Sequence, residues 1–428
     1  MNISQPVEVA IIGAGIAGIA TAYYLSVEQK KSVMLLDYRQ PMSYTSAQSG
    51  DNYRNWWPHP TMTAFSNDSI ELMERLAEQT QNVFHMTRGG YVLATRRRDI
   101  GDMLADLPPN IDVDVITGGK DIQHRFPALA DDIQNVIHIK RAGDISGQQL
   151  GALMLGRFRE AGGRQLRGEV TSIDGDKSHE LLVDTGQDTQ QVRADVIVNA
   201  AGPFANRVAQ MLGAELPIKN IYQQKISFTD RLSVIPRDMP FSIDMDEKQL
   251  HWSDEERALL SDDPDVAWLT ERLPPGTHCR PDGGVHGTSV KLGWAYNQTA
   301  SEPQRELADD VAIDPQFPEI VMRGAAALLP ALNAYVDEPP SRFAHYGGYY
   351  TMTHENWPLI GPVGPENSYV VAALSGFGSM TACAAGKLCA AWVCGDVLPD
   401  YASNLSLERY ADKALIDRLQ NQSNKGLL

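Results

Sequence analysis

A glycine-rich turn near the start of the sequence has the residue types and the spacing that hold a dinucleotide. The turn reads Gly13, Ala14, Gly15, Ile16, Ala17 and Gly18. The first glycine permits a tight turn, the second lets the backbone approach a pyrophosphate, and the third lets a helix pack closely on a strand. Asp37 follows Gly13 by 24 residues. A carboxylate at that distance can accept hydrogen bonds from ribose hydroxyls.

The residues around this turn predict the elements that position it. Residues 7–12 are an apolar run typical of a buried parallel strand, residues 16–25 have helical apolar spacing, and residues 32–36 form a second buried strand. Together they make a β–α–β unit with the phosphates expected at the helix N-terminus. Such a unit binds an ADP moiety, which belongs to either NAD or FAD.

The rest of the chain alternates between apolar strands and helices. Strands are predicted at residues 90–95, 192–200 and 285–295, and helices at residues 66–78, 148–161, 317–329 and 379–393. The length of 428 residues suits two or three domains, and the 43% hydrophobic and 21% charged fractions suit a globular core. We therefore expect a large α/β protein.

Charge excludes some partners. Lys and Arg total 37 against 54 Asp and Glu, so the net charge is 37 − 54 = −17. An acidic surface repels phosphate backbones, which argues against nucleic acid and against anionic membranes. Residues 244–265 carry part of the excess and predict a solvated loop and helix.

Two apolar stretches, at residues 7–25 and 368–398, are expected in the core, because glycines and charges interrupt them. No integral membrane segment is therefore expected.

The four cysteines are Cys279, Cys383, Cys389 and Cys394. Their spacing lacks the paired pattern of a zinc site, so we expect no metal. Buried free thiols suit a reducing compartment, which predicts a cytoplasmic protein.

Five motifs in order give the chain a family resemblance. They are the 13–18 turn with Asp37, the run 45–50 (TSAQSG), the run 199–205 (NAAGPFA), the run 290–294 (VKLGW), and the run 357–362 (WPLIGP) followed by 375–378 (SGFG). This pattern resembles the FAD-dependent D-amino-acid oxidase superfamily, closest to the branch of monomeric sarcosine oxidase and glycine oxidase. The resemblance covers nearly the whole chain.

The resemblance implies a fold and a division of the chain. It implies an α/β protein in which a Rossmann-like FAD-binding domain is interleaved with an α+β substrate domain on a mostly antiparallel sheet. The FAD-binding domain would comprise residues 1–85, 145–215 and 344–405. The substrate domain would comprise residues 86–144 and 216–343, with a C-terminal helical tail at 406–428.

The resemblance also assigns the residues that would hold FAD. Beyond the glycine turn and Asp37, they are Tyr38, Thr45, Ser46, Ser49, Gly50, Val170, Ala200, Ala201, Gly202, Gly348, Gly376, Phe377, Gly378, Ser379 and Met380. Related enzymes that attach the flavin covalently use a Cys where Gly348 stands, or a His within the segment 45–51, which contains none. The expected FAD is therefore non-covalent.

Lys291 is the candidate catalytic residue. On a strand over residues 288–294, Lys291 shares a face with Ser289 and Gly293, while Val290 and Leu292 share the other. In the sarcosine oxidase branch the matching lysine activates oxygen, which favours an oxidase. The alternative from the residues alone is a solvent-facing strand lysine.

Substrate recognition is where the chain departs from that branch. Sarcosine oxidase has a Lys near the position of Met380, and a thioether cannot pair with a carboxylate. Arg54 and Arg280 remain as candidates for a bidentate carboxylate clamp, and either could instead form a structural ion pair. Arg280 precedes Lys291 by eleven residues and is expected across a hairpin from it. Tyr349, Tyr350 and Trp294 are candidate aromatic walls, with core packing as the alternative.

The implied reaction is oxidation of a secondary amine or amino acid. Hydride moves from the C–H next to nitrogen to flavin N5, O2 is reduced to H2O2, and the imine is hydrolysed. One alternative is a dehydrogenase of the same fold that passes electrons to a quinone or carrier. Another is a flavin-binding subunit of a larger complex. We expect a small-molecule substrate and a monomer or homodimer.

Overall fold

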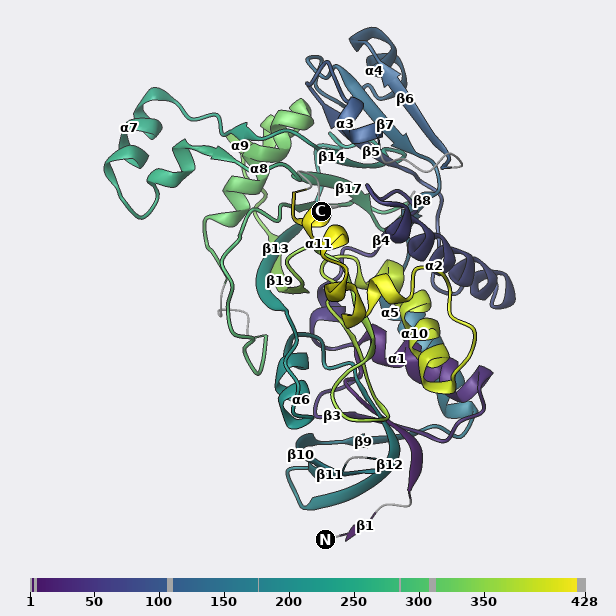
Figure 1. Ribbon diagram of the computed structural model, residues 1–428. Coiled ribbons are helices and arrows are strands. Elements are labelled where there is room, and N and C mark those ends of the chain that lie inside the picture. The colour runs from purple at the N-terminus through teal and green to yellow at the C-terminus, as the bar shows by residue number, and fades with distance from the viewer. Residues whose placement is uncertain are drawn as a thin grey trace.

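Two β-sheets organise the computed structural model (Figure 1). The structure describes residues 2–3, 6–105, 111–175, 177–284, 286–307 and 313–421. Val285 of the expected strand 285–295, and residues 422–428 of the expected tail, lie outside these ranges. In Figure 1 the first sheet lies in the lower part of the molecule and the second in the upper part.

The first sheet has a parallel centre built on the N-terminal β–α–β unit. Its strands are β2 (Val7–Ile12), β3 (Val33–Asp37), β9 (Arg164–Arg167), β12 (Thr189–Asn199), β21 (Ser368–Ala372) and β20 (Leu359–Pro362). β11 (His179–Asp184) and β1 (Asn2–Ile3) pair with the first half of β12, and β10 (Glu169–Asp174) pairs with β11. The pairs β2–β3, β2–β12, β3–β9 and β12–β21 are parallel. Helices cover both faces of such a sheet, which is why β3 is buried up to Asp37.

Helices on one face form the larger core of this half. They are α1 (Ile16–Tyr23), which continues as one π-turn to Glu28, α2 (Pro60–Gln79), α5 (Gly147–Glu160) and α10 (Gly378–Cys394). A Cβ on Gly386 of α10 would lie 2.5 Å from the carbonyl carbon of Ala20, so the small residues of α10 permit its close contact with α1. On the opposite face, Val208 of α6 (Ala205–Met211) belongs to a second apolar cluster that includes Ile12 and Met34.

The second sheet has eight strands and is antiparallel except between β14 and β5. Its order is β19 (Phe343–Met352), β13 (Lys219–Thr229), β18 (Ser289–Gly293), β17 (His278–Asp282), β14 (Phe241–Asp244), β5 (Tyr91–Thr95), β7 (Asn135–Ile139) and β6 (Val113–Thr117). Apolar side chains such as Ile226 and Leu292 pack against α8 (Phe317–Leu328) and its neighbours. The opposite face of this sheet turns toward the first sheet and its helices, which together we call the first domain, and carries the site described below.

The remaining elements connect the two sheets or lie at their edges. They are β4 (Asn52–Arg54), β8 (Ala142–Asp144), α3 (Gly101–Leu104), α4 (Gly119–Arg125), β15 (Lys248–Gln249), β16 (Arg272–Leu273), α9 (Asn333–Asp337) and α11 (Lys413–Asn421). The β4–β8 ladder brings the segment after the first sheet beside the second.

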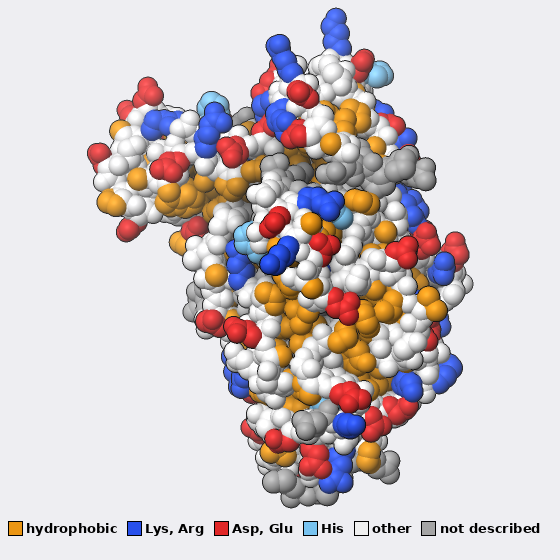
Figure 2. Space-filling view, viewed as in Figure 1, with side chains coloured by type: hydrophobic (Ala, Val, Ile, Leu, Met, Phe, Trp, Pro, Cys, Tyr) orange, Lys and Arg blue, Asp and Glu red, His pale blue; other side chains and the backbone are white. Residues whose placement is uncertain are grey.

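An arm carrying α7 (Asp254–Asp262) projects from the body of the molecule (Figure 1). Acidic and basic side chains mix on its surface (Figure 2). A capping box between Ser253 and Glu256 begins the helix, and no residue of α7 is buried. The solvated loop and helix expected at 244–265 is therefore correct for α7. It is wrong for Asp244, which is buried and paired with Lys248 at 2.6 Å and Arg96 at 3.1 Å.

The strands and helices predicted from periodicity correspond to observed elements, with ends that shift by a few residues. The expected boundary at residue 344 falls one residue into β19, which pairs with β13 in the second sheet rather than joining the first. None of the helices in the described part of the chain is both long and apolar enough to cross a membrane.

Candidate active site

The glycine turn brings the backbone of β2 and α1 against the end of β12. Gly13 has φ of +112°, and a Cβ there would lie 2.2 Å from the carbonyl oxygen of Ala200. A Cβ on Gly18 would lie 1.9 Å from the carbonyl oxygen of Gly13. Both positions therefore require glycine, as expected for a turn that lets backbone approach a ligand.

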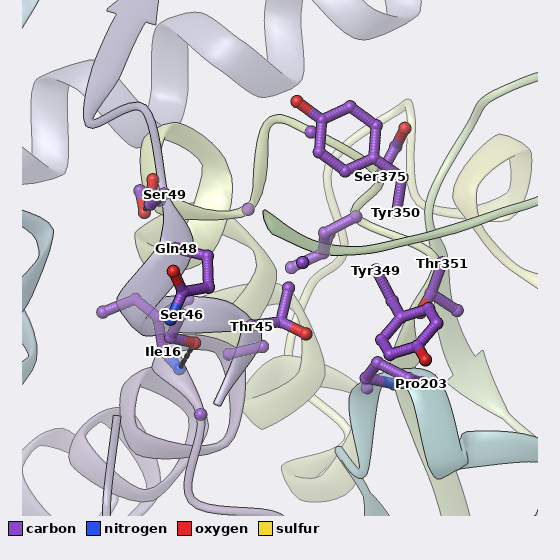
Figure 3. A pocket seen from close by; sticks show the side chains of 18 of the residues that line it. Ile16, Thr45, Ser46, Gln48, Ser49, Pro203, Tyr349, Tyr350, Thr351 and Ser375 are labelled. Atoms are coloured by element: carbon purple, nitrogen blue, oxygen red, sulfur yellow. Dashed lines mark hydrogen bonds between the residues drawn. The ribbon is translucent and has the colours of Figure 1, made fainter. Parts of the chain in front are cut away.

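Asp37 fixes the shape of this turn. Its carboxylate accepts hydrogen bonds from the backbone N–H of Ala14 at 2.8 Å and of Arg39 at 2.9 Å. The Ser46 hydroxyl accepts the N–H of Ile16 at 3.0 Å, so it caps the first turn of α1 (Figure 3). Asp37 therefore has two roles. Its hydrogen bonds fix the shape of the turn, and the residue also lines the cavity beside the turn.

Three adjoining cavities follow the glycine turn. The outer cavity, of about 830 Å³, is lined by Gly13, Asp37, Tyr38, Val170 and Ala201 among others. The middle cavity, of about 440 Å³, shares Gly13 and Asp37 with it and adds Ala14, Thr45 and Ser46. The inner cavity, of about 800 Å³, shares Gly15, Thr45 and Ser46 with the middle one. Their shared walls make one elongated channel.

Both domains line the inner cavity. Thr45, Ser46, Gln48 and Ser49 lie on one side of it in Figure 3, and Tyr349, Tyr350 and Thr351 of β19 on the other. The predicted residues that line it are Gly15, Ile16, Ala17, Thr45, Ser46, Ser49, Gly50, Ala200, Gly202, Gly348, Tyr349, Tyr350, Gly376, Gly378 and Ser379.

The start of α10 closes the far end of the channel. The Ser379 hydroxyl donates to the Ser49 hydroxyl at 2.8 Å, which joins the α10 N-terminus to the segment after β3. A Cβ on Gly376 would lie 2.6 Å from the Tyr350 ring, so glycine is needed for that ring to lie where it does. Phe377 and Met380 do not line the inner cavity but face a cavity beside it.

This side cavity, of about 580 Å³, is the fourth part of the site. It shares Ser49, Gly50, Lys225, Tyr350, Gly376 and Ser379 with the inner cavity. Its own walls include Arg54, Trp57, Tyr91, Phe241, His278 and Met380. A chamber with aromatic walls and a few charged groups, open to the inner cavity, is a typical small-molecule site.

Arg54 is fully surrounded in this side cavity. The residue is 2% exposed, its Nε donates to the carbonyl oxygen of Trp56 at 3.2 Å, and its guanidinium carbon lies 5.2 Å from the Trp57 ring centroid and 5.6 Å from that of Tyr91. Burial lowers the pKa of Arg54 to about 10. Arg54 and Met380 thus line the same chamber, and the role of Arg54 as a carboxylate-binding residue stays a prediction.

Arg280 and Lys291 form a charged cluster next to this chamber. They are direct partners across the β17–β18 hairpin, which confirms the expected hairpin. Asp282 lies 3.0 Å from Arg280 Nη2 and 3.4 Å from Lys291 Nζ. Neither cation lines the inner or the side cavity. Arg280 also donates to the Gly50 carbonyl at 3.0 Å, so it holds the Gly50 loop in place.

Burial shifts the protonation of two groups in and beside this cluster. It lowers the pKa of Lys291, with the charge of Arg280 as the second cause, although Asp282 opposes the shift. Burial raises the pKa of Asp51, against the opposing charge of Lys291. Asp51 lines the side cavity, so the cluster reaches the chamber through this carboxyl group.

Trp294 does not belong to the site. It is 1% exposed, packs in the core of the second domain, and donates its indole N–H to the Pro274 carbonyl at 3.0 Å. The period-two pattern explains this position: Trp294 shares the apolar face of Val290 and Leu292, whereas Lys291 faces the other way. Trp294 therefore packs in the core, which was the alternative to a place in the substrate site.

Two cations in the channel were not predicted. Arg39 lines the outer and middle cavities with its guanidinium 3.9 Å from the Tyr44 ring centroid, and its Nε and Nη2 make no hydrogen bond to any described residue. The sequence feature that points to Arg39 is its position two residues after Asp37. Lys225 lines both the inner and the side cavity and lies in a segment without any motif.

The channel suits FAD rather than a nicotinamide cofactor alone. A glycine turn of the phosphate-binding type lies at its middle, and the Arg39 guanidinium beside it, 4.0 Å from Glu306, supplies positive charge for a pyrophosphate. A wide inner cavity extends from there to the start of α10. A Rossmann-like turn, an interleaved second sheet and a chamber at their junction fit the architecture of a flavin-dependent oxidoreductase.

The family comparison agrees with this class. The family model described as "FAD dependent oxidoreductase" (DAO) matches residues 8–392, and the chain belongs to that family. It is therefore an FAD-dependent oxidoreductase.

Individual relatives are distant. Human mitochondrial dimethylglycine dehydrogenase is 25% identical over 289 residues, which cover 63% of this chain and 33% of that protein. Human peroxisomal sarcosine oxidase is 25% identical over 217 residues, 49% of this chain and 54% of that protein. The chain thus spans about a third to a half of the length of the dimethylglycine dehydrogenases that it matches.

Solved structures share the fold over nearly the whole chain. L-proline dehydrogenase from P. horikoshii has a TM-score of 0.73 at 18% identity, covering 95% of this chain and 98% of its own. Glycine oxidase from Geobacillus kaustophilus has a TM-score of 0.73 at 16% identity, covering 94% and 99%. These neighbours confirm the expected fold, with a Rossmann-like domain and a second, mostly antiparallel sheet.

Proposed function

We propose that the protein oxidises an amine that carries a carboxylate, such as an amino acid or an N-alkyl amino acid, and passes the electrons to O2. The observation that carries the proposal is the side cavity, which opens into the flavin-binding channel and has Arg54 in its wall. The dimethylglycine, sarcosine and glycine enzymes among the similar proteins lend support.

The chain's own residues bind, orient and shield the substrate. Trp57, Tyr91 and Phe241 give the side cavity an apolar lining, which favours a neutral amine over an ammonium. Arg54 attracts the carboxylate, and Tyr350 lies at the opening between the two cavities. When bound, FAD supplies the acceptor for a hydride from the C–H next to nitrogen.

No acid–base pair is required of the protein for such a transfer. Its contribution is to hold the reacting carbon at the inner cavity in a fixed orientation and to exclude water. Asp51 is the carboxyl group in the lining of the side cavity, and burial raises its pKa. It is therefore the candidate for any proton transfer to or from the substrate.

Oxygen is the proposed acceptor because of Lys291. A lysine beside the flavin channel supplies positive charge where negative charge develops on oxygen. A second candidate is a dehydrogenase that reduces a quinone or carrier. It is favoured by the ion pair between Lys291 and Asp282, which offsets the lysine charge.

We propose that the FAD is held without a covalent bond. Gly348 lines the inner cavity and has no side chain to form one, and the lining residues of that cavity include neither Cys nor His. Acid precipitation should release all yellow colour into the supernatant, and colour retained on the pellet would contradict non-covalent binding.

A substrate screen tests the function. Purified holoenzyme is mixed without oxygen with N-methyl amino acids, D- and L-amino acids and matched amines that lack a carboxylate. We expect flavin bleaching only with carboxylate-bearing compounds, and H2O2 on admission of air. Bleaching by the uncharged amines alone would contradict the substrate class. Bleaching without H2O2 would favour the carrier-linked dehydrogenase.

A further inference from the structure

Lys225 is a lysine held at the junction of the two cavities. It belongs to β13 and lines both the inner cavity and the side cavity. The residue is 8% exposed. Its Nζ lies 5.4 Å from the Tyr350 ring centroid, and its Cε is 3.7 Å from the position that a Cβ on Gly50 would occupy. Most of the side chain is therefore buried, and Lys225 lines the cavities where a substrate would meet the flavin.

Lys225 has no acidic partner within the described ranges of the chain. No carboxylate or other group there forms an ion pair or a hydrogen bond with its Nζ. Asp51 lines the same side cavity, but the strongest opposing charge on it comes from Lys291. An ammonium group that lines a cavity and has no counter-charge beside it attracts an anionic ligand. Such a group is stable when a ligand supplies the anion.

The neighbours of Lys225 do not supply that anion. His278 donates its Nδ1–H to the Gly276 carbonyl at 2.8 Å, and burial lowers the pKa of His278 to about 4, with Lys225 among the charges that contribute. The ring is therefore neutral at pH 7. Arg54, in the same chamber, adds a second positive charge. The side cavity thus has two cations and the single carboxyl group of Asp51 in its lining.

We propose that Lys225 binds the carboxylate of the substrate. The inference rests on the proposed function and names the residue that determines its specificity for an acid. A carboxylate at Lys225 would place the adjacent carbon at the opening to the inner cavity, because Lys225 lines both chambers. It also accounts for Met380 in the same wall, since the positive charge reaches the chamber from β13 and not from α10.

A pair of probes that differ only in charge tests the role. Holoenzyme is titrated with acetate and with acetamide while the flavin absorbance is followed. In the parent protein we expect a spectral change with acetate and a much weaker one with acetamide. In Lys225→Met the acetate Kd should rise at least tenfold while the acetamide response stays unchanged, and Lys225→Arg should recover part of the acetate affinity.

Further outcomes separate this role from others. Acetate affinity unchanged in Lys225→Met but lost in Arg54→Met would overturn the role of Lys225 and leave the proposed function standing. A parent protein that does not prefer acetate over acetamide would contradict both. Slower reoxidation by O2 in Lys225→Met with an unchanged acetate Kd would overturn the inference in favour of a role toward the acceptor. If Lys225→Met does not retain flavin, Lys225→Gln serves in the same titrations.

Discussion

Lys225 on β13 and His278 on β17 lie on either side of Gly293 in one row of the second sheet, and no side chain stands between them. Both residues pair with Gly293, and a Cβ there would lie 2.3 Å from His278 Nε2. Glycine in the middle strand therefore lets the imidazole extend across β18. Because paired residues share a face of the sheet, the lysine and the histidine both face the side cavity, and Lys225 also lines the inner cavity.

The neutral state of His278 predicts a pH-dependent stability. Its pKa is about 4 in the folded protein because of burial, against 6.5 for an ordinary histidine. Between those values the unfolded chain binds a proton that the folded chain does not, so stability falls as the pH falls. The free energy of unfolding should decrease by about 3 kcal/mol from pH 6.5 to 4 through this residue.

Chemical unfolding of FAD-saturated protein across that pH range measures the effect. His278→Gln should remove this part of the pH dependence, whereas His124→Gln, at an exposed position, should retain it. If the His278→Gln curve keeps the slope of the parent, the loss of stability in acid comes from other groups.

Gly13→Ala should weaken FAD binding. The new methyl group would meet the Ala200 carbonyl at 2.2 Å, in a backbone conformation with φ of +112° that L residues rarely adopt. The methyl group would clash with backbone directly after β12, and Gly13 directly follows β2, so relieving the clash would require these two paired strands to separate. We expect FAD to bind at least tenfold more weakly, a loss of about 1.4 kcal/mol or more.

The ratio of flavin to protein absorbance after gel filtration reports this change. Gly89→Ala is the matched control, because nothing lies within 4 Å of the added methyl group. Full flavin content in Gly13→Ala would show that the close approach of these strands is not what shapes the channel.

The phosphate-binding part of the site could be predicted because its geometry is local. The turn, its helix and Asp37 follow one another within 25 residues of the chain. Spacing alone therefore specifies their relation. The Arg280–Lys291 hairpin was predictable for the same reason.

Lys225 could not be predicted, because its role depends on long-range strand register. Its local sequence, QQKIS, has no motif, and the side chain reaches the site only because β13 pairs with both β18 and β19. Trp294 shows the opposite case: its alternation with Lys291 indicates the core face, and this alternation is a stronger signal than the aromatic residue type. Asp244 was placed in a solvated segment because composition does not show that Lys248 and Arg96 surround it.

A buried ion pair fixes the C-terminal segment to the first domain. Arg409 is fully buried, and its guanidinium donates to Glu355 at 2.6 and 2.7 Å and to the Pro358 carbonyl at 2.7 Å. Arg409→Met would leave a buried carboxylate with much of its charge uncompensated, at a cost of about 3–5 kcal/mol. We therefore expect a clearly lower thermal midpoint, measured by calorimetry.

Two further variants identify the cause of that loss. Arg409→Met combined with Glu355→Gln should recover part of the stability, because the unpaired charge is removed. Arg97→Met breaks an exposed pair with Asp102 and should cost about 0.5 kcal/mol or less. Equal losses in the Arg409→Met and Arg97→Met variants would show that burial does not set the strength of the Arg409 pair.

Lys291→Met should slow the reoxidation of reduced flavin by oxygen at least tenfold, since it removes the positive charge proposed to favour electron transfer to O2. Enzyme photoreduced without air and then mixed with aerated buffer gives the rate by stopped-flow absorbance. Lys291→Arg keeps the charge and is expected to retain most of the rate. Neither variant should change the acetate Kd, because Lys291 lines neither cavity.

The pH profile of that rate gives a sharper test of the same lysine. Burial and the neighbouring charge of Arg280 lower the pKa of Lys291 below 10.5. The protonated form is the one that attracts developing negative charge, so the rate should fall as pH rises through this lowered pKa. Lys291→Arg should be flat over the same range, because a guanidinium stays protonated. A parent profile equal to that of the arginine variant would assign oxygen reduction to another group and favour an electron acceptor other than O2.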